Sequence, residues 1–235
     1  AEEIDVYGSS IKNVQGIEAF TSLRILNCFE TQIVKLDVSR NTALEYLSCY
    51  KNQLTEIDLS KNTLLKLLSC DGNQITSLDM RRNTHLETLV CTNNKIQTLD
   101  LSNNRNLKEI QCSVNLIKSI DITRNTVLEV LSCINNKLTN LDVSNNTSLR
   151  ELSCGLNQLT ILDLSKNERL TSLWCGNNKL TNLDVRKNIA LSGLGCSLNP
   201  DLRIICMSSD QLKLAKKDRE NWLKDESAIW SSDCN

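Results

Sequence analysis

The sequence predicts a solenoid, in which stacked coils of the chain share one continuous core. Three observations lead to this prediction. Cysteine recurs every 21 residues from Cys28 to Cys196, asparagine recurs at two fixed distances from each cysteine, and apolar residues hold five further fixed positions. A fixed period of this size is the signature of a repeat architecture.

The repeat reads C-x-x-N-x-L-x-x-L-D-L-S-x-N-x-x-L-x-x-L-x, counting the cysteine as position 1, and it occurs eight times over residues 28–195. The apolar spacings of 3, 2, 6, 3, 2 and 5 do not fit the alternating 3 and 4 of a coiled coil. Spacings of two place alternate side chains on one face, as in a β-strand. Each coil is therefore expected to carry two short strands and no helix.

Asparagine fills position 4 in the coils from Asn52 to Asn199 and position 14 in those from Asn41 to Asn188, while the first coil has Thr31 at position 4. A chain that turns sharply leaves backbone groups without partners, and an inward amide can both donate to them and accept from them. The two rows predict two corners in each coil.

The pattern L-x-x-L-x-C-x-x-N-x-L followed by L-x-x-L-D-L-S-x-N resembles the leucine-rich-repeat consensus over about residues 11–204. It is most similar to the 21-residue class of bacterial secreted and cell-surface proteins. The resemblance implies a right-handed solenoid with a parallel sheet, a binding role, and an extracellular or cell-surface location. It does not identify a ligand, because one fold serves many partners.

The two ends depart from the repeat. Residues 1–27 lack the Asn and Asp landmarks and are interpreted as an N-terminal cap, residues 28–195 hold the eight repeats, and residues 196–235 form a partial repeat with a C-terminal cap. The composition of residues 210–224 predicts a helix there. The end of the chain resembles the terminal caps of related bacterial surface proteins, which imply a disulfide between Cys206 and Cys234.

Composition excludes several classes of partner. The chain has 27 basic and 28 acidic residues and a net charge of -1, so no overall field attracts nucleic acid or an anionic membrane. No apolar run approaches the ~20 residues of a membrane-spanning helix, and the first residues lack the features of a signal peptide. A mature, soluble monomer without a cofactor is expected.

The rows of cysteine and aspartate could suggest a catalytic or metal-binding site. Coils about 4.8 Å apart would stack the nine thiols in a packed interior, in a register that gives poor disulfide torsions, so buried structural thiols are predicted. The Asp row from Asp37 to Asp184 could attract calcium, but basic residues at the neighbouring position 13 favour a structural ladder. His85 is the single histidine, and no hydrolase motif is present. No catalytic or metal site is predicted.

The candidate binding residues lie on the outward face of the cysteine strand. Position 2 varies between coils, and a variable position is not dictated by packing. Four aromatic side chains are expected to point outward on or beside these strands, namely Phe29, Tyr46, Tyr50 and Trp174. Exposed aromatic residues are favoured anchors for a protein or polysaccharide ligand, and ordinary cross-strand packing is the alternative.

Three functional hypotheses follow. The first is a non-catalytic extracellular or cell-surface binding module that recognises a protein or glycan through this face. The alternative is a structural spacer within a longer surface protein, with binding carried elsewhere. The third is an enzyme or metal-storage protein built on the thiol or Asp row.

Overall fold

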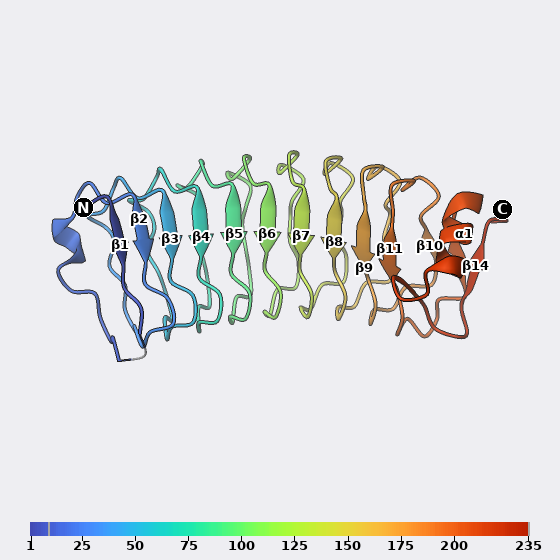
Figure 1. Ribbon diagram of the computed structural model, residues 1–235, viewed down its shortest axis with the longest axis horizontal. Helices are drawn as coiled ribbons and strands as arrows, with labels where there is room; N and C mark the ends of the chain where they lie inside the picture. Colours follow the sequence, from blue (N-terminus) through green and yellow to red (C-terminus); the bar gives the residue numbers. More distant parts are fainter. Residues whose placement is uncertain (9, 235) are drawn as a thin grey trace. The chain divides into compact units, whose positions relative to one another are not determined.

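The computed structural model describes residues 1–8 and 10–234. It forms two compact units, Ala1–Ile117 and Lys118–Asn235, called unit 1 and unit 2 below. Each unit is a parallel β-solenoid in which every pair of neighbouring strands runs in the same direction (Figure 1).

In unit 1 the parallel sheet follows the chain order, and one short 3-10 helix precedes its second strand. The elements are β1 (Glu3–Asp5), η1 (Ile17–Ala19), β2 (Ile25–Asn27), β3 (Tyr46–Ser48), β4 (Leu67–Ser69), β5 (Thr88–Val90) and β6 (Glu109–Gln111).

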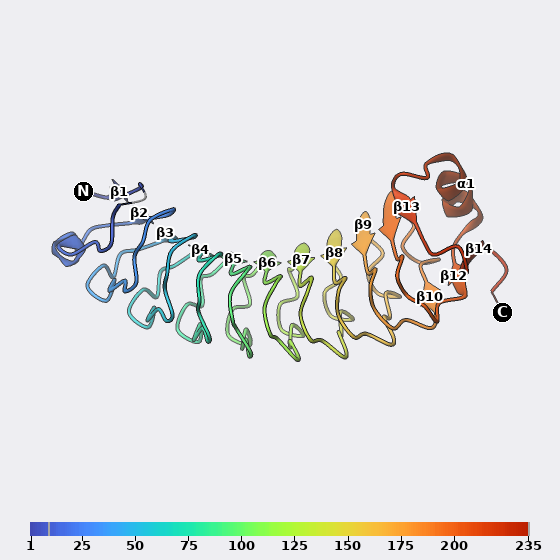
Figure 2. The ribbon, with the colours of Figure 1, turned by 90° about the horizontal axis from the view of Figure 1, so that it is seen from below.

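Unit 2 carries two parallel sheets, with strand orders β7-β8-β9-β11-β13 and β10-β12-β14, and its helix lies near its C-terminal end (Figure 2). The elements are β7 (Val130–Ser132), β8 (Glu151–Ser153), β9 (Ser172–Trp174), β10 (Leu183–Asp184), β11 (Gly193–Gly195), β12 (Ile204–Cys206), α1 (Ser209–Lys217), β13 (Trp222–Leu223) and β14 (Ile229–Ser231).

The repeated strand occupies the three residues before each cysteine. Its middle residue is buried and its two flanking residues are directed outward, as β3 illustrates with buried Leu47 between exposed Tyr46 and half-buried Ser48. The cysteine then turns its side chain inward, and the Cys49 N–H donates to the Ser69 carbonyl at 2.7 Å. The expected alternation of inward and outward side chains is therefore present.

The second half of each coil is non-helical, but it forms fewer strands than two per coil would require. Within unit 1 the described residues of this half contain one isolated bridge, between Leu78 and Leu99. In unit 2, β10 pairs with β12 and β12 with β14. The Asp of each L-D-L segment accepts a hydrogen bond from the backbone two residues later, as Asp37 does from Ser39 at 2.9 Å. This turn ends the extended segment.

The two asparagine rows stabilise two corners, as the sequence predicts. In the position-4 row, Asn73 Nδ2 donates to the carbonyls of Cys49, Cys70 and Asp71, and its Oδ1 accepts from the Leu54 N–H at 2.9 Å. In the position-14 row, Asn83 Nδ2 donates to two carbonyls, at 3.1 and 2.9 Å, while its buried Oδ1 has no partner. The first row therefore makes more bonds per side chain.

The residue between the position-2 side chain and the position-4 Asn has a positive φ in every coil from Glu30 to Leu198. Asn and Gly tolerate this left-handed conformation best, and β-branched residues tolerate it least. Asn93, Asn135 and Asn177 follow the preference, whereas Val114 does not. The sharp turn is thus imposed by the coil geometry on whichever residue stands there.

At the C-terminal end, side chains of the cap replace the missing next coil. Gln211 of α1 is buried, and its Nε2 donates to the carbonyls of Val185 and Asn188, which is the role of a position-14 Asn. The Asp225 carboxylate accepts from the N–H groups of Leu198 and Asn199. Backbone groups that the solenoid would leave unpaired are satisfied in this way.

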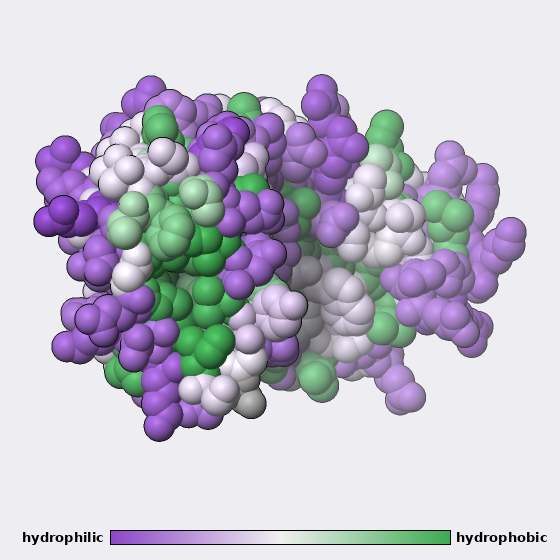
Figure 3. Space-filling view, turned by 60° about the vertical axis from the view of Figure 1, so that its left-hand side comes forward, coloured by the Kyte–Doolittle hydropathy of each residue, from purple (hydrophilic) through white to green (hydrophobic). Residues whose placement is uncertain are grey.

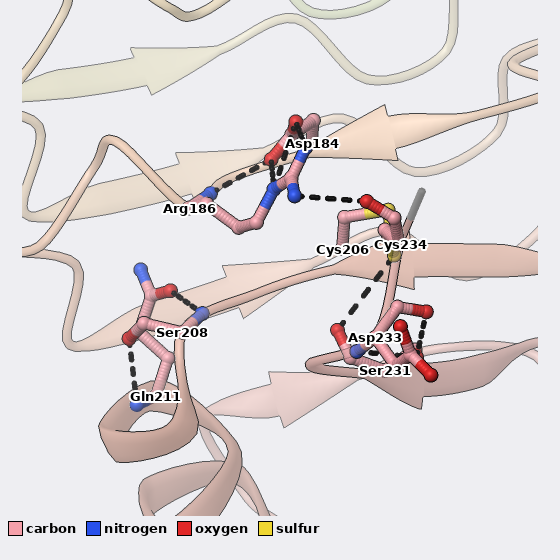
Figure 4. Close-up of a disulfide and its surroundings, with 8 residues drawn as sticks. All are labelled: Asp184, Arg186, Cys206, Ser208, Gln211, Ser231, Asp233 and Cys234. Carbon is pink, nitrogen blue, oxygen red and sulfur yellow. Dashed lines mark hydrogen bonds and ion pairs between the residues drawn. A yellow bond between two sulfur atoms is a disulfide. The ribbon is translucent and has the colours of Figure 1, made fainter.

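A disulfide joins Cys206 of β12 to Cys234, with an S–S distance of 2.11 Å (Figure 4). Beside it, Arg186 forms an ion pair with Asp184 at 2.7 Å and donates to the Cys234 carbonyl at 3.0 Å. The end of the described chain is therefore held to β10 and β12 by both a covalent bond and a charged contact.

The predicted cap helix is shorter than residues 210–224. It ends at Lys217, and Asn221 then donates from its backbone and its side-chain amide to the Asp218 carboxylate. Trp222 pairs with Leu194 in the sheet and is 4% exposed. Burying this indole against the last coil outweighs the helix propensity of the segment.

At the N-terminal end, β1 pairs with β2 and adds a strand before the first repeat. Figure 3 brings this end forward and shows apolar surface gathered in one area, with hydrophilic side chains around it. Exposed apolar residues of this part of unit 1 include Tyr7, Phe20 and Val34.

Candidate binding surface

The candidate surface consists of the outward side chains of each strand and the residue that follows each cysteine. The inward positions hold leucine, isoleucine and cysteine almost without exception, and these side chains are buried. The outward positions range from glycine to tryptophan. Because packing does not fix them, their identity is free to serve recognition.

Three aromatic rings form a continuous stack on unit 1. Phe29 and Tyr50 have ring centroids 4.7 Å apart and planes inclined by 4°, and Tyr7 lies over Phe29 at 6.3 Å with 13°. Phe29 and Tyr50 are therefore stacked on each other. Phe29 thus lies between the other two rings, and both Phe29 and Tyr50 are half-buried.

Tyr7 was not singled out by the sequence pattern. Counting back 21 residues from Phe29 leads to Gly8, but the pairing of Glu3 with Ile25 shows that the first coil contains one extra residue. Tyr7 therefore takes the position that precedes Phe29 in the stack. Finding Tyr7 from the sequence would have required the register of β1 against β2, which the sequence alone does not fix.

Charged groups lie at the end of the aromatic stack. Lys51 Nζ lies 5.8 Å from the Tyr50 ring centroid and 2.6 Å from the Glu30 carboxylate. The hydrogen bond from Lys51 to Glu30 raises the pKa of the lysine, which keeps it charged. A cation over a ring face gains electrostatic energy, so Lys51 holds Tyr50 in place.

Tyr46 is 39% exposed on β3 and stands apart from the stack. Next to it, the Glu45 carboxylate accepts from Lys66 at 2.6 Å and from Arg24 at 2.8 Å. These bonds, first from Lys66 and then from Arg24, lower the pKa of Glu45. The structure thus brings Phe29 and Tyr50 together and leaves Tyr46 beside a row of alternating charges.

Trp174 is the candidate residue of unit 2, where it ends β9 with 49% of its surface exposed. Its indole lies over Gly195 of the neighbouring strand β11. The described residues include no ring that stacks on it. It is therefore a single platform and not part of an aromatic cluster.

The nine cysteines of the repeat row are all buried, and none of them forms a disulfide. Burial raises the pKa of the Cys28 and Cys112 thiols to about 12, and it raises those of Cys70 and Cys91 well above the ordinary value. The thiolate is the nucleophile and metal ligand, so these groups are held in their unreactive form. They pack as small apolar side chains.

We expect a thiol reagent to distinguish the nine cysteines of the repeat row from the two cysteines of the C-terminal cap. Under native conditions no cysteine should react with a disulfide-exchange reagent within minutes, because the row is buried and the cap pair is bonded. Denaturation without reductant should release nine reactive thiols, and denaturation after reduction eleven. Rapid labelling of the native protein would contradict the packed row.

The Asp row makes local turns. Ser39 donates its backbone N–H to Asp37 and Ser144 does so to Asp142, each at 2.9 Å. Arg81 donates to Asp79 from its backbone and its guanidinium, and mainly the guanidinium bonds lower the pKa of Asp79 to about 2. Within the described residues, no group of three His, Cys, Asp or Glu side chains is placed to hold a metal ion.

We expect the protein to become less stable in acid because the carboxylates of the Asp row become protonated. The pKa values of Asp58, Asp79 and Asp121 are lowered by bonds from the following turn. Because the folded pKa lies below the unfolded value of about 3.9, the contribution is complete above about pH 5 and is lost progressively as the pH falls toward 2. Thermal unfolding at pH 5, 4, 3 and 2 measures the loss, and Asp79→Asn should reduce it. A constant melting temperature across this range would contradict the prediction.

His85 lies on an exposed turn, with Nδ1 at 3.1 Å from the Thr63 carbonyl. It has no acidic or nucleophilic partner among the contacts of the described residues. A membrane-spanning helix is likewise not found in the described chain, where α1 has nine residues.

Neither the protein-family models nor the curated proteins gave a match. The functional domain of InlJ from Listeria monocytogenes, which includes a cysteine ladder, is similar in structure with a TM-score of 0.70 and 34% identity. The match covers 88% of this chain and 53% of the InlJ chain, so this chain spans about half of that relative's length.

Two further solved structures share the fold at lower identity. An internalin, InlF, from L. monocytogenes 4b F2365 has a TM-score of 0.66 and 19% identity, covering 100% of this chain and 87% of its own. The leucine-rich-repeat ectodomain of the receptor kinase GASSHO1/SCHENGEN3 from Arabidopsis thaliana, in complex with CASPARIAN STRIP INTEGRITY FACTOR 2, has a TM-score of 0.75 and 20% identity. It covers 97% of this chain and 33% of its own.

Proposed function

Because the chain is a leucine-rich-repeat protein with a 21-residue repeat, we propose that it is a non-catalytic binding module whose outward sheet surface recognises a protein partner. The recognition residues proposed on unit 1 are Phe29, Tyr46 and Tyr50, to which the structure adds Tyr7. Trp174 is proposed as a separate contact on unit 2. The aromatic stack of unit 1 is the observation that carries this proposal.

The chemistry of the stack favours a protein over a flat ligand. Phe29 lies between Tyr7 and Tyr50, and Lys51 lies over the Tyr50 ring, so few ring faces are left for a planar ligand. Ring edges and tyrosine hydroxyls suit the mixture of apolar side chains and backbone groups on a protein surface. Aromatic side chains held rigid lose little entropy on binding, and they are enriched among the residues that dominate interface energies.

One ion pair beside the stack and another beside Tyr46 support the same proposal. Lys51 pairs with Glu30 and Lys66 with Glu45, both at 2.6 Å, close to the aromatic residues. A rim of charges around an apolar centre is the usual anatomy of a protein interface. The charges would steer and orient the partner more than they would add affinity.

An extracellular or cell-surface location is part of the proposal. The Cys206–Cys234 disulfide supports it, because disulfides persist mainly in oxidising compartments. The complex of the Arabidopsis ectodomain indicates that this fold is compatible with partner binding outside the cell. The raised thiol pKa values and the isolated His85 support a role without catalysis.

A binding screen against extracellular proteins tests the proposal. The wild type is compared with a variant carrying Phe29→Ser, Tyr46→Ser and Tyr50→Ser. The matched control carries Val34→Ser and Leu64→Ser, which remove exposed apolar side chains elsewhere on unit 1 (49% and 45% exposed). Circular dichroism confirms that each variant is folded.

A partner that binds the wild type and the control but loses at least tenfold in affinity with the triple variant would support the proposal. A partner that binds all three proteins equally would place the interface on another surface. Absence of any protein partner would favour the spacer hypothesis.

A further inference from the structure

We propose that Trp174 is the centre of a saccharide-binding platform on unit 2, which takes a neutral pyranoside chain with its flat C–H face on the indole. This inference deepens the proposed function by naming a second ligand class. It rests on the proposed function only in treating the outward sheet surface as a binding surface.

The indole is held flat with one face open. A Cβ atom built on Gly195 would lie 2.3 Å from Cε3, 2.4 Å from Cζ3 and 2.8 Å from Cδ2 of Trp174. A point so close to three ring carbons lies above the ring plane, so one indole face covers Gly195. Since 49% of Trp174 is nevertheless exposed, the opposite face is open to solvent.

The side chains around the platform are short. In the sheet register Ser153 and Gly195 flank Trp174, while Glu151 and Gly193 flank Ser172 one pair further along. Seryl and glycyl residues do not reach the height of an indole. The direct in-register neighbours of the ring are therefore a serine and a glycine, and Leu223 of β13 follows beyond Gly195.

Two polar groups on this face of the sheet suit sugar hydroxyls, namely the Glu151 carboxylate on β8 and the Trp174 Nε1–H. Glu151 is exposed, and no ion pair or hydrogen bond engages its carboxylate among the described contacts. A carboxylate can accept from two neighbouring hydroxyls, and such charge-assisted bonds are about twice as strong as neutral ones. Nor does the Trp174 Nε1–H have a partner in the described part of the chain, so it can donate to a hydroxyl or ring oxygen.

The electrostatics of the ring explain the choice of ligand. The face of an aromatic ring is negative, and the C–H groups on one side of an all-equatorial pyranose form a flat, weakly positive surface. A quaternary ammonium ion would also be attracted, but its recognition uses a cage of several rings. Trp174 has no stacked ring beside it among the described residues.

Titration with cellohexaose and with chitohexaose tests the platform, with intrinsic fluorescence and calorimetry as readouts. Trp222 is buried and Trp230 is partly buried in the cap, whereas Trp174 is half exposed, so a ligand on Trp174 should shift the emission of that residue to the blue and protect it from acrylamide. We expect saturable binding of at least one oligosaccharide. Trp174→Ser should weaken it at least tenfold, and Glu151→Gln several-fold.

Two further variants make the result specific. Gly195→Ala keeps the tryptophan but forces its ring off the strand, and it should weaken binding at least fivefold. Phe20→Ser removes an aromatic side chain of unit 1 that is 39% exposed and lies outside the proposed recognition residues, and it should leave oligosaccharide binding unchanged. Circular dichroism of each variant separates loss of the site from loss of the fold.

Three results would overturn the platform. These are no binding of either hexasaccharide at millimolar concentration, equal binding by wild type and Trp174→Ser, and tetramethylammonium binding at Trp174 in place of sugar. None of them bears on the protein partner sought with the unit 1 variants. Conversely, sugar binding that depends on Trp174 would stand even if no protein partner were found.

Discussion

Replacing Asn73 by alanine is expected to lower the free energy of unfolding by about 4 kcal/mol. The side chain donates to three backbone carbonyls and accepts from the Leu54 N–H, all at a buried corner of unit 1. Alanine would leave that N–H without a partner in a place that water cannot easily reach. An unsatisfied buried donor costs more than the bond itself contributes.

Asn83→Ala provides a matched comparison. It removes the same atoms from another buried position of the same unit, so the loss of packed volume is similar. Asn83 makes only two donated bonds and its Oδ1 already has no partner, so a cost of about 2 kcal/mol is expected. The difference between the free energies of unfolding of the two variants gives the contribution of the additional hydrogen bonds that Asn73 makes.

Urea unfolding followed by circular dichroism measures both variants, with Gln74→Ala as the exposed control. Gln74 is a neighbour of Asn73 with an exposed side chain, and its substitution should change stability by less than about 0.5 kcal/mol. Equal costs for Asn73→Ala and Asn83→Ala would show that the amide oxygen contributes nothing. The explanation given for the position-4 corner would then be wrong.

Removing the cap disulfide with Cys206→Ala and Cys234→Ala is expected to lower the stability of unit 2 by about 3–4 kcal/mol. The bond closes a loop with a sequence separation of 28 residues, and loop closure restricts the unfolded chain. In the folded state it joins β12 to the residues that follow β14. The amides of β14 should therefore exchange with solvent faster in the variant.

A reducing agent gives the control for this experiment. The row of nine cysteines is free in the folded protein, so a phosphine reductant has one bond to break. It should lower the melting temperature of the wild type to that of the double variant and leave the variant unchanged. An unaffected wild type would mean that the Arg186 contacts and the strand pairing hold the cap without the disulfide.

The repeat by itself determined most of the architecture. A buried position that recurs every 21 residues leaves few alternatives to stacked parallel coils, and the two asparagine rows located both corners. The outward direction of Tyr46 and Trp174 also followed, because side chains alternate across a strand. These features depend on local periodicity, which a sequence records directly.

Only the tertiary structure decided the features that depend on register between distant segments or on the ends of the solenoid. The extra residue in the first coil places Tyr7 on Phe29, and the open indole face of Trp174 depends on the glycine of the next strand. Trp222 lies in strand β13 and not in the predicted helix, and Gln211 makes the hydrogen bonds of a position-14 asparagine. In each case a non-local contact outweighed the local preference, and a periodic pattern carries no information where the period ends.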